Sequence, residues 1–420
     1  MRQSAVPVES PLTERPFGCF TLTIFQMSRP RLKAGYCLLT WLHIYAVAYY
    51  GNYLFFQLRN EYGFSSRQNL LVAALIGLIY VPASWYGGRF AQRRGYFAAL
   101  KLGLGGMAVA LGAGAVLPGL GARMVVLVVW TLAVCFTWAP LEALTSESTS
   151  RAGVARMVGI YNVIWSSGAA VAYFTGGALK EALGGASLYW LPAAVHALQW
   201  LLAHRFEKAA GRTGVAASAP VPVPVGESDF AKHHVSPAMA KAFLHMAWVA
   251  NPFAYVAMNT LVPLIPELAS RFQLTTTLAG FVASVWLFAR LGAFVLLWRW
   301  TAWHYRFGWL AAAFAVMTAS FVVLLLTSSL AVLVIAQLVF GFGVGLIYYS
   351  SLFYSMDVGA ESQGEHGGYH ETLIGIGLMV GPAVGAATSY LAPAAPRAGV
   401  WAVGSLLCGG LAVLMWVRRR

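Results

Sequence analysis

The chain has 420 residues, of which 59% are hydrophobic and 10% charged, and its mean hydropathy is +0.67. Because the charged residues fall almost entirely between long apolar stretches, this composition excludes an ordinary soluble globular protein. A net charge of +14 could indicate a nucleic-acid partner, but the basic residues are spread over the connections between the apolar stretches.

Twelve apolar stretches follow one another along the chain, each about 20 residues long, which lets an α-helix cross a hydrocarbon layer of about 30 Å. The first six cover residues 34–58, 69–88, 97–117, 124–144, 154–178 and 186–204, and the second six cover 239–264, 276–298, 308–328, 330–354, 368–390 and 398–417. We therefore expect an all-α membrane protein in which twelve transmembrane helices form two six-helix bundles.

The domain boundaries follow from these stretches. We expect a cytoplasmic N-terminal extension at 1–33, a first bundle at 34–204, a cytoplasmic linker at 205–238, a second bundle at 239–417 and a basic cytoplasmic tail at 418–420. The linker contains a Pro- and Val-rich run from Ala217 to Gly226, which favours an extended tether. Met27 directly precedes the first stretch and is an alternative start of the natural chain, which leaves residues 1–26 open.

Basic residues predict the orientation in the membrane. Of the 28 Lys and Arg residues, 21 fall on the side of the termini and the linker, 6 fall on the other side, and Arg290 lies inside a stretch. Since positive charge marks the cytoplasmic face, we expect a multi-pass protein of the inner (cell) membrane with both termini in the cytoplasm. The four cysteines have no metal-binding spacing, so no metal or other cofactor is expected.

An internal repeat relates the two halves. A shift of 209 positions superimposes the fifth stretch on the eleventh and aligns Gly159 with Gly368, Gly168 with Gly377, Gly176 with Gly385, Tyr161 with His370, and Asn162 with Glu371. These matches fall between stretches of equal rank, which favours a duplication and a pseudo-two-fold relation between the bundles.

The connection between the second and third stretches reads Gly88-Arg89-Phe90-Ala91-Gln92-Arg93-Arg94-Gly95-Tyr96. It resembles the cytoplasmic loop signature of the major facilitator superfamily: Gly88, Arg93 and Gly95 match, whereas Gln92 stands where the family has an acid and Tyr96 replaces a basic residue. The resemblance implies a transporter with the twelve-helix fold and a loop that acts as a conformational latch. It identifies no subfamily.

Arg290 is the candidate binding residue with the most unusual position, because it lies well inside the eighth stretch. A cation at such a depth costs about 2.5 to 3.5 kcal/mol, so it should face a cavity or a carboxylate. It would either anchor an anionic or hydroxyl-rich substrate or take part in an ion pair; a third interpretation is an arginine that extends towards the cytoplasmic surface.

Two acids lie within the apolar stretches, Glu371 at the start of the eleventh and Glu142 near the end of the fourth. A carboxylate that pairs with an arginine in one conformation and loses it in another can take up and release a proton. We expect Glu371 to carry the proton, with His370, Glu142 and His43 as further candidates. The alternative for Glu371 is a helix cap.

Polar residues at helical spacing predict the lining of a central cavity. Tyr45, Tyr49 and Asn52 form one stripe on the first stretch, and Asn251, Tyr255 and Asn259 form another on the seventh. The resemblance implies that the first, fourth, seventh and tenth stretches line this cavity, which adds Trp138 and Tyr348; Asn162 joins them through its repeat alignment with Glu371. Packing or lipid contact remains the alternative for each aromatic residue.

We therefore expect a secondary transporter, not an enzyme, that moves a small polar organic solute by alternating access in symport with protons. A proton-driven exporter of amphipathic compounds is the alternative, and a membrane-embedded enzyme or a non-transporting sensor represents a different class. The expected partners are a small-molecule substrate, protons and membrane lipids, with no nucleic acid, and the chain is expected to be a monomer.

Overall fold

The computed structural model describes residues 29–146, 151–212, 235–358 and 363–419. Within these ranges the chain is helical, and short turns join the helices. Residues 1–28, the proline-rich run of the linker and residue 420 of the predicted tail lie outside the described residues.

The first half of the described chain forms six rods from seven helices. They are α1 (Arg29–Tyr62), α2 (Ser66–Arg94), α3 (Tyr96–Val116), α4 (Leu120–Val134), α5 (Trp138–Ser146), α6 (Arg151–Leu183) and α7 (Ser187–Arg212). α4 and α5 are two parts of one rod, since Leu120–Thr145 is long and apolar enough to cross a membrane as a unit. α7 continues to Arg212, within the segment that the sequence assigns to the linker.

The second half repeats this arrangement. It consists of α9 (Pro237–Arg271), α10 (Thr276–Ala283), α11 (Val285–Arg299), α12 (Phe307–Leu326), α13 (Leu330–Val358), α14 (Gln363–Leu391) and α15 (Ala398–Arg419). α10 and α11 form one rod, Thr276–Arg299, with a short break at Ser284. The described chain therefore contains the twelve rods that the apolar stretches predict.

Nine rods of the described chain pass the criteria of length and hydropathy for a membrane span. The other three are α1, α6 and α7, and each buries polar side chains, such as His43 on α1, Asn162 on α6 and His196 on α7. Such residues lower the hydropathy of a helix without shortening it. They are tolerated in lipid when the helix turns them towards protein.

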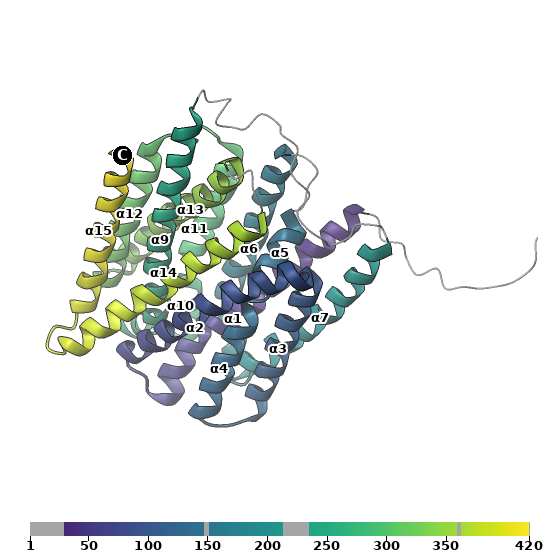
Figure 1. Ribbon diagram of the computed structural model, residues 1–420. Helices are drawn as coiled ribbons and strands as arrows, with labels where there is room; N and C mark the ends of the chain where they lie inside the picture. The colour runs from purple at the N-terminus through teal and green to yellow at the C-terminus, as the bar shows by residue number, and fades with distance from the viewer. Residues whose placement is uncertain (1–28, 147–150, 213–234, 359–362, 420) are drawn as a thin grey trace, which may run out of the picture.

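The helices of the two halves form two groups that meet along α2 and α14 (Figure 1). α6 also contacts α10 and α11 across this boundary, and α1 contacts α9. The described chain begins and ends on the same face, which we call the near face; the far face holds the turns after α1, α3, α6, α9, α12 and α14.

The crossing of α2 and α14 depends on a glycine. A Cβ atom at Gly77 would lie 2.4 Å from the backbone nitrogen of Met379, so only a residue without a side chain fits there. Small residues let helix backbones approach closely in a membrane. Gly77 thus sets the distance between the two bundles at mid-depth, beside the cavity described next.

Candidate functional site

A cavity of about 290 Å³ lies between the two bundles. α1, α2, α4, α5 and α6 line it from the first bundle, and α9, α11, α13 and α14 line it from the second. A cavity at the boundary of two helical bundles, apolar for the most part with a few polar groups, is a common form of small-molecule site. Its polar groups therefore decide what it can hold.

Arg290 of α11 is the basic residue of the cavity lining, and its side chain is 4% exposed. Its guanidinium lies over three aromatic rings, with the carbon Cζ 4.5 Å from the ring centre of Trp165, 5.0 Å from Tyr348 and 5.4 Å from Phe294. Trp165 belongs to α6, so this contact joins the two bundles. The sequence-based prediction that Arg290 faces a cavity agrees with this position.

The hydrogen bonds of Arg290 are incomplete. Nη1 donates to the thioether sulfur of Met258 over 3.5 Å, and the Tyr255 side chain lies beside the guanidinium. Nε and Nη2 are buried and have no hydrogen-bond partner among the described residues. A buried donor of a charged group without a hydrogen-bond partner is costly in free energy. A ligand that accepts hydrogen bonds from these two nitrogens would remove that cost.

Glu371 of α14 also lines the cavity, and it accepts a hydrogen bond of 2.5 Å from the hydroxyl of Tyr80 on α2. This bond joins the two bundles at mid-depth. Glu142 of α5 lies close enough to Glu371 for their charges to interact. We call Glu371 and Glu142 the carboxylate pair.

Arg290 and the carboxylate pair do not form the ion pair that the sequence suggested as one possibility. Tyr255 lies near both Arg290 and Glu371, and no ion pair of Arg290 with a described carboxylate is present. The cavity thus has a cationic wall at Arg290 of α11 and an acidic wall at Glu371 of α14, whereas Glu142 of α5 is not among the lining residues.

The lining contains seven of the residues predicted for substrate binding or proton transfer. These are Asn52, Trp138, Tyr255, Asn259, Arg290, Tyr348 and Glu371. They come from six rods, because α1, α5, α9, α11, α13 and α14 each bring at least one of them to the same space. The sequence predicted these residue positions one by one, and the structure brings them together in one cavity.

Two predicted tyrosines of α1 do not line the cavity. The hydroxyl of Tyr45 is 2.9 Å from Oγ1 of Thr175, and the hydroxyl of Tyr49 is 2.8 Å from Oγ of Ser187. Both bonds lie within the first bundle. Tyr45 and Tyr49 therefore connect α1 to α6 and to the start of α7, and their contact with substrate stays a prediction.

Three further candidates lie inside a bundle instead of at the cavity. Asn162 accepts a hydrogen bond of 3.0 Å from Nε1 of Trp165, and Asn251 is 1% exposed. The imidazole of His43 is fully buried, with Nε2 2.9 Å from Oγ1 of Thr137. These contacts suit packing or the positioning of neighbours. The side chain of His370 lies outside the described residues.

The sequence did not single out Trp165 or Tyr161 as cavity residues, although both line the cavity from α6. Tyr161 does appear in the repeat alignment, paired with His370. Trp165 lies one helical turn after Asn162, which the repeat alignment pairs with Glu371. The abundance of aromatic residues hides such positions, because 14% of the chain is aromatic.

The predicted conformational loop lies between α2 and α3. Gly95 follows the last residue of α2 and has a φ of +92°. Residues other than glycine rarely adopt this backbone conformation. Gly88 is buried within α2, whereas Gln92 and Arg93 are exposed. Gln92 is uncharged, and Arg93 forms no ion pair with a described residue, so the structure shows the turn of the motif without a charge-paired latch.

Contacts between the bundles close the cavity towards the far face. The hydroxyl of Ser66 on α2 donates to the carboxylate of Glu267 on α9, and Nδ2 of Asn69 donates to the carbonyl of Pro263 over 3.3 Å. On the other side of the cavity, Glu181 of α6 accepts hydrogen bonds from the backbone N–H and the hydroxyl of Thr277 at the start of α10. These contacts describe a conformation that is sealed at the far face.

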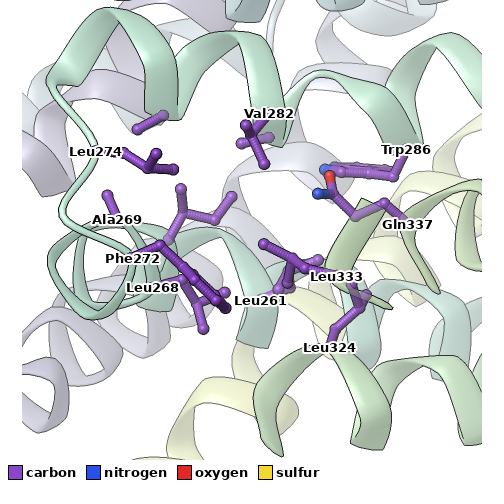
Figure 2. Close-up of a pocket in the computed structure, with 13 residues that line it drawn as sticks. Leu261, Leu268, Ala269, Phe272, Leu274, Val282, Trp286, Leu324, Leu333 and Gln337 are labelled. Carbon is purple, nitrogen blue, oxygen red and sulfur yellow. The ribbon is translucent and has the colours of Figure 1, made fainter. Parts of the chain in front are cut away.

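A second pocket lies inside the second bundle (Figure 2). It is about 20 Å³ in volume, and its wall consists of apolar side chains with Gln337 beside Trp286 at one end. A space of this size holds about one water molecule. It is a packing gap, and the larger cavity is the candidate site.

Comparisons with known proteins agree with this architecture. The sequence model described as "Major Facilitator Superfamily" matches residues 3–173. The chain matches no curated protein sequence.

Solved structures with a similar fold cover nearly the whole chain. The human organic anion transporter MFSD10 (TETRAN) is 17% identical, with 92% of this chain and 99% of that chain covered and a TM-score of 0.66. A mutant of the nucleoside transporter NupG is 13% identical, with 92% and 98% covered and a TM-score of 0.63. A bacterial homologue of the human drug peptide transporters PepT1 and PepT2 is 14% identical, with 94% and 99% covered and a TM-score of 0.63.

Proposed function

We propose that the chain is a secondary transporter of the major facilitator superfamily and that it carries a small polar organic solute in symport with protons. The support for the family is the match of its sequence model to residues 3–173 and the similar fold of the solved structures. The observation that carries the proposal is that the cavity lining holds a cation, Arg290 of α11, and an acid, Glu371 of α14, on different helices. Tyr255 lines the same cavity and lies near both Arg290 and Glu371. A solute and a proton can therefore occupy the same cavity on different residues.

Each wall has a separate task in this mechanism. Arg290, Asn52 and Asn259 orient the polar groups of the solute, and the rings of Trp138, Trp165 and Tyr348 cover its apolar part. Glu371 holds the proton while Tyr80 donates to the same carboxylate across the bundle boundary. When the bundles tilt, the bond from Tyr80 lengthens and the surroundings of Glu371 change, so that proton affinity differs between the two conformations.

We propose further that the near face is cytoplasmic, that the membrane is the inner (cell) membrane and that the protein acts as a monomer. The support is the distribution of Lys and Arg, with 21 on the side of the termini and the linker and 6 on the other side. Under this orientation, the conformation described above is closed towards the outside.

Transport measurements on proteoliposomes test the proposal. Solutes that raise the melting temperature of the purified protein are selected first. Their uptake is then measured with and without an inward proton gradient. We expect gradient-driven accumulation by the wild type. Glu371→Gln should lose accumulation but retain exchange of solute across the membrane, because a neutral amide cannot carry the proton.

Glu207→Gln is the matched control, since Glu207 pairs with Lys101 outside the cavity, with a distance of 2.6 Å between Oε2 and Nζ. It should behave as the wild type does. Full gradient-driven accumulation by Glu371→Gln would remove Glu371 from the proton path. Outward movement of the solute driven by the inward proton gradient would favour the alternative, an exporter of amphipathic compounds. The aromatic walls of the cavity could also accommodate such compounds.

A further inference from the structure

We propose that the solute is an organic monocarboxylate and that its carboxylate binds to the Nε–Nη2 edge of Arg290; this proposal rests on the proposed transport function. The unpaired atoms determine the chemistry. Nε and Nη2 point along the same edge of the planar guanidinium and form the fork that binds both oxygens of a carboxylate. These are the two nitrogens of Arg290 without a partner among the described residues.

The aromatic rings around Arg290 stack against the guanidinium, so an anion can bind only at the Nε–Nη2 edge. Trp165, Tyr348 and Phe294 lie against the guanidinium at 4.5, 5.0 and 5.4 Å from Cζ to the ring centres, and such rings stack on its faces. Nη1 is already directed to the sulfur of Met258. Stacking and hydrogen bonding use different directions of the same group, so the rings hold Arg290 in place while the free edge binds an anion.

The described residues of the protein provide no anion for this edge. Arg290 is 4% exposed and forms no ion pair with a carboxylate in the described part of the chain. Glu371 is engaged by Tyr80, and Tyr255 lies beside Arg290. A buried cation without a counter-ion is unfavourable, and binding of a solute anion removes this cost. The unpaired Nε and Nη2 are thus suited to an anionic group that arrives with the solute.

The rest of the lining indicates what the carboxylate is attached to. Arg290 is the one basic residue among the described residues that line the cavity, which fits one carboxylate and not two. Trp130, Trp138, Trp165 and Trp286 lie in the same lining, with aliphatic residues of α1 and α9 around them. Such walls favour an aromatic or aliphatic body over a sugar-like one.

Trp165 couples this binding to the movement of the bundles. It belongs to α6, whereas Arg290 belongs to α11, and Nε and Nη2 are covered in the present conformation. A relative tilt of the bundles changes the position of the indole over the guanidinium. The carboxylate therefore gains access to the edge in the conformation in which Trp165 has moved aside.

Binding to the purified full-length protein tests the proposal without a transport assay. The probes are matched pairs of a carboxylate and its primary amide: benzoate and benzamide, phenylacetate and phenylacetamide, hexanoate and hexanamide. We expect at least one carboxylate to raise the melting temperature and to bind at least about tenfold more tightly than its amide, a difference of about 1.4 kcal/mol. Arg290→Gln should abolish the preference, and Arg290→Lys should weaken it because an ammonium lacks the fork.

Arg271→Gln is the matched control, because Arg271 lies at the far end of α9, where Nη1 donates to the carbonyl of Leu325 over 2.8 Å. It should retain the full preference for carboxylates. Equal binding of acids and amides by the wild type, absence of binding by every carboxylate at millimolar concentration, or a retained preference in a folded Arg290→Gln protein would overturn the proposal.

Uptake by proteoliposomes separates this inference from the proposed function. Carboxylate binding that depends on Arg290, without any proton-driven uptake of the bound acid, would support the ligand class and contradict the transport mechanism. Proton-driven uptake of amides, without preference for the acids, would support the mechanism and contradict the ligand class.

Discussion

Arg290 has an energetic disadvantage that the fold does not compensate. Two of its nitrogens are buried without a hydrogen-bond partner among the described residues. Each such donor costs about 1–3 kcal/mol. Stacking on Trp165 and Tyr348 returns about 0.5–2 kcal/mol per ring. A residue with this balance is favoured by function and not by stability.

Replacement of Arg290 by an apolar residue of similar length therefore tests its role. We expect Arg290→Met to melt at the same temperature as the ligand-free wild type or above it, because the unpaired charge disappears while the contacts with the rings remain. Differential scanning fluorimetry of the purified protein measures this.

Arg271→Met is the comparison, since Arg271 donates to the carbonyl of Leu325 and lies 3.5 Å from Glu267, measured from Nη2 to Oε1. This variant should melt below the wild type. A clear decrease for Arg290→Met, as large as that for Arg271→Met, would indicate that Arg290 has a structural role.

At single residues, the sequence could predict the chemical role of a side chain better than the direction in which the side chain points. Arg290 and Glu371 stand out because charge inside an apolar stretch is costly, and both line the cavity. Tyr45 and Tyr49 do not line the cavity. Helical spacing shows which residues share a face but not which face meets the cavity. On α1, the cavity stripe contains Ile44, Ala48 and Gly51.

Among the helices, close crossings determine how the bundles meet. A Cβ atom at Gly177 of α6 would lie 2.3 Å from the carbonyl oxygen of Thr276, at the start of α10. Next to it, Phe174 stacks on Phe281 with 4.5 Å between ring centres. The far face can therefore close at this crossing only while position 177 lacks a side chain.

A larger residue at this crossing should open the far face. We expect Gly177→Val to shift the protein away from the sealed conformation, since overpacking costs about 1–3 kcal/mol here and nothing in a conformation where α6 and α10 are apart. Spin labels at Leu183 and Leu330, which are exposed near the far ends of α6 and α13, report the distance between the bundles.

The matched control is Gly112→Val, because a Cβ atom at Gly112 of α3 would have no neighbour within 4 Å. Its distance distribution should equal that of the wild type. An unchanged distribution for Gly177→Val would show that this crossing does not limit the opening of the bundles.

Glu181 adds a pH dependence to the same crossing. It lies beyond the apolar stretch 154–178, and hydrogen bonds from the hydroxyl and the backbone N–H of Thr277 hold its pKa below the ordinary carboxyl value in the sealed conformation. A pKa that is lower in the sealed conformation stabilises that conformation at neutral pH. The stabilisation is lost as the pH falls through the lowered pKa.

We therefore expect the labels at Leu183 and Leu330 to move apart when the pH falls below the ordinary glutamate pKa of about 4.3. Glu181→Gln should lose this response, because an amide does not titrate. Glu61→Gln should retain it, since Glu61 accepts a hydrogen bond of 2.8 Å from Gln57 within the first bundle. A response that is identical in all three proteins would assign the pH dependence to another group.

The course of the helices could be predicted where hydropathy decides it. All twelve apolar stretches correspond to rods, because the requirement to span lipid fixes both length and composition. The breaks at Cys135–Thr137 and at Ser284 were not predicted, since neither contains proline or glycine. The extension of α7 to Arg212 was not predicted either, because a helix can continue into water after its apolar part ends.

For the whole molecule, the structure combines a sealed far face with a mostly apolar cavity between the bundles that holds a few polar groups. Ser66 with Glu267 and Glu181 with Thr277 close two sides of the same boundary, whereas Tyr80 with Glu371 joins the bundles beside the cavity. Alternating access requires these contacts to break together. The pseudo-symmetric halves, which the repeat of 209 residues predicted, allow the bundles to tilt as rigid units.

Labelling of a cavity residue from each side of the membrane tests this central claim most directly. Val262 lines the cavity from α9, and Val262→Cys in a background without the four native cysteines is exposed to an impermeant maleimide in vesicles of defined orientation. Leu100→Cys, at a fully buried position inside the first bundle, is the unlabelled control. We predict that Val262→Cys is labelled from both sides, and that cross-linking of Ser66→Cys to Glu267→Cys restricts labelling to one side. Labelling from a single side without the cross-link, or equal labelling from both sides with it, would contradict alternating access.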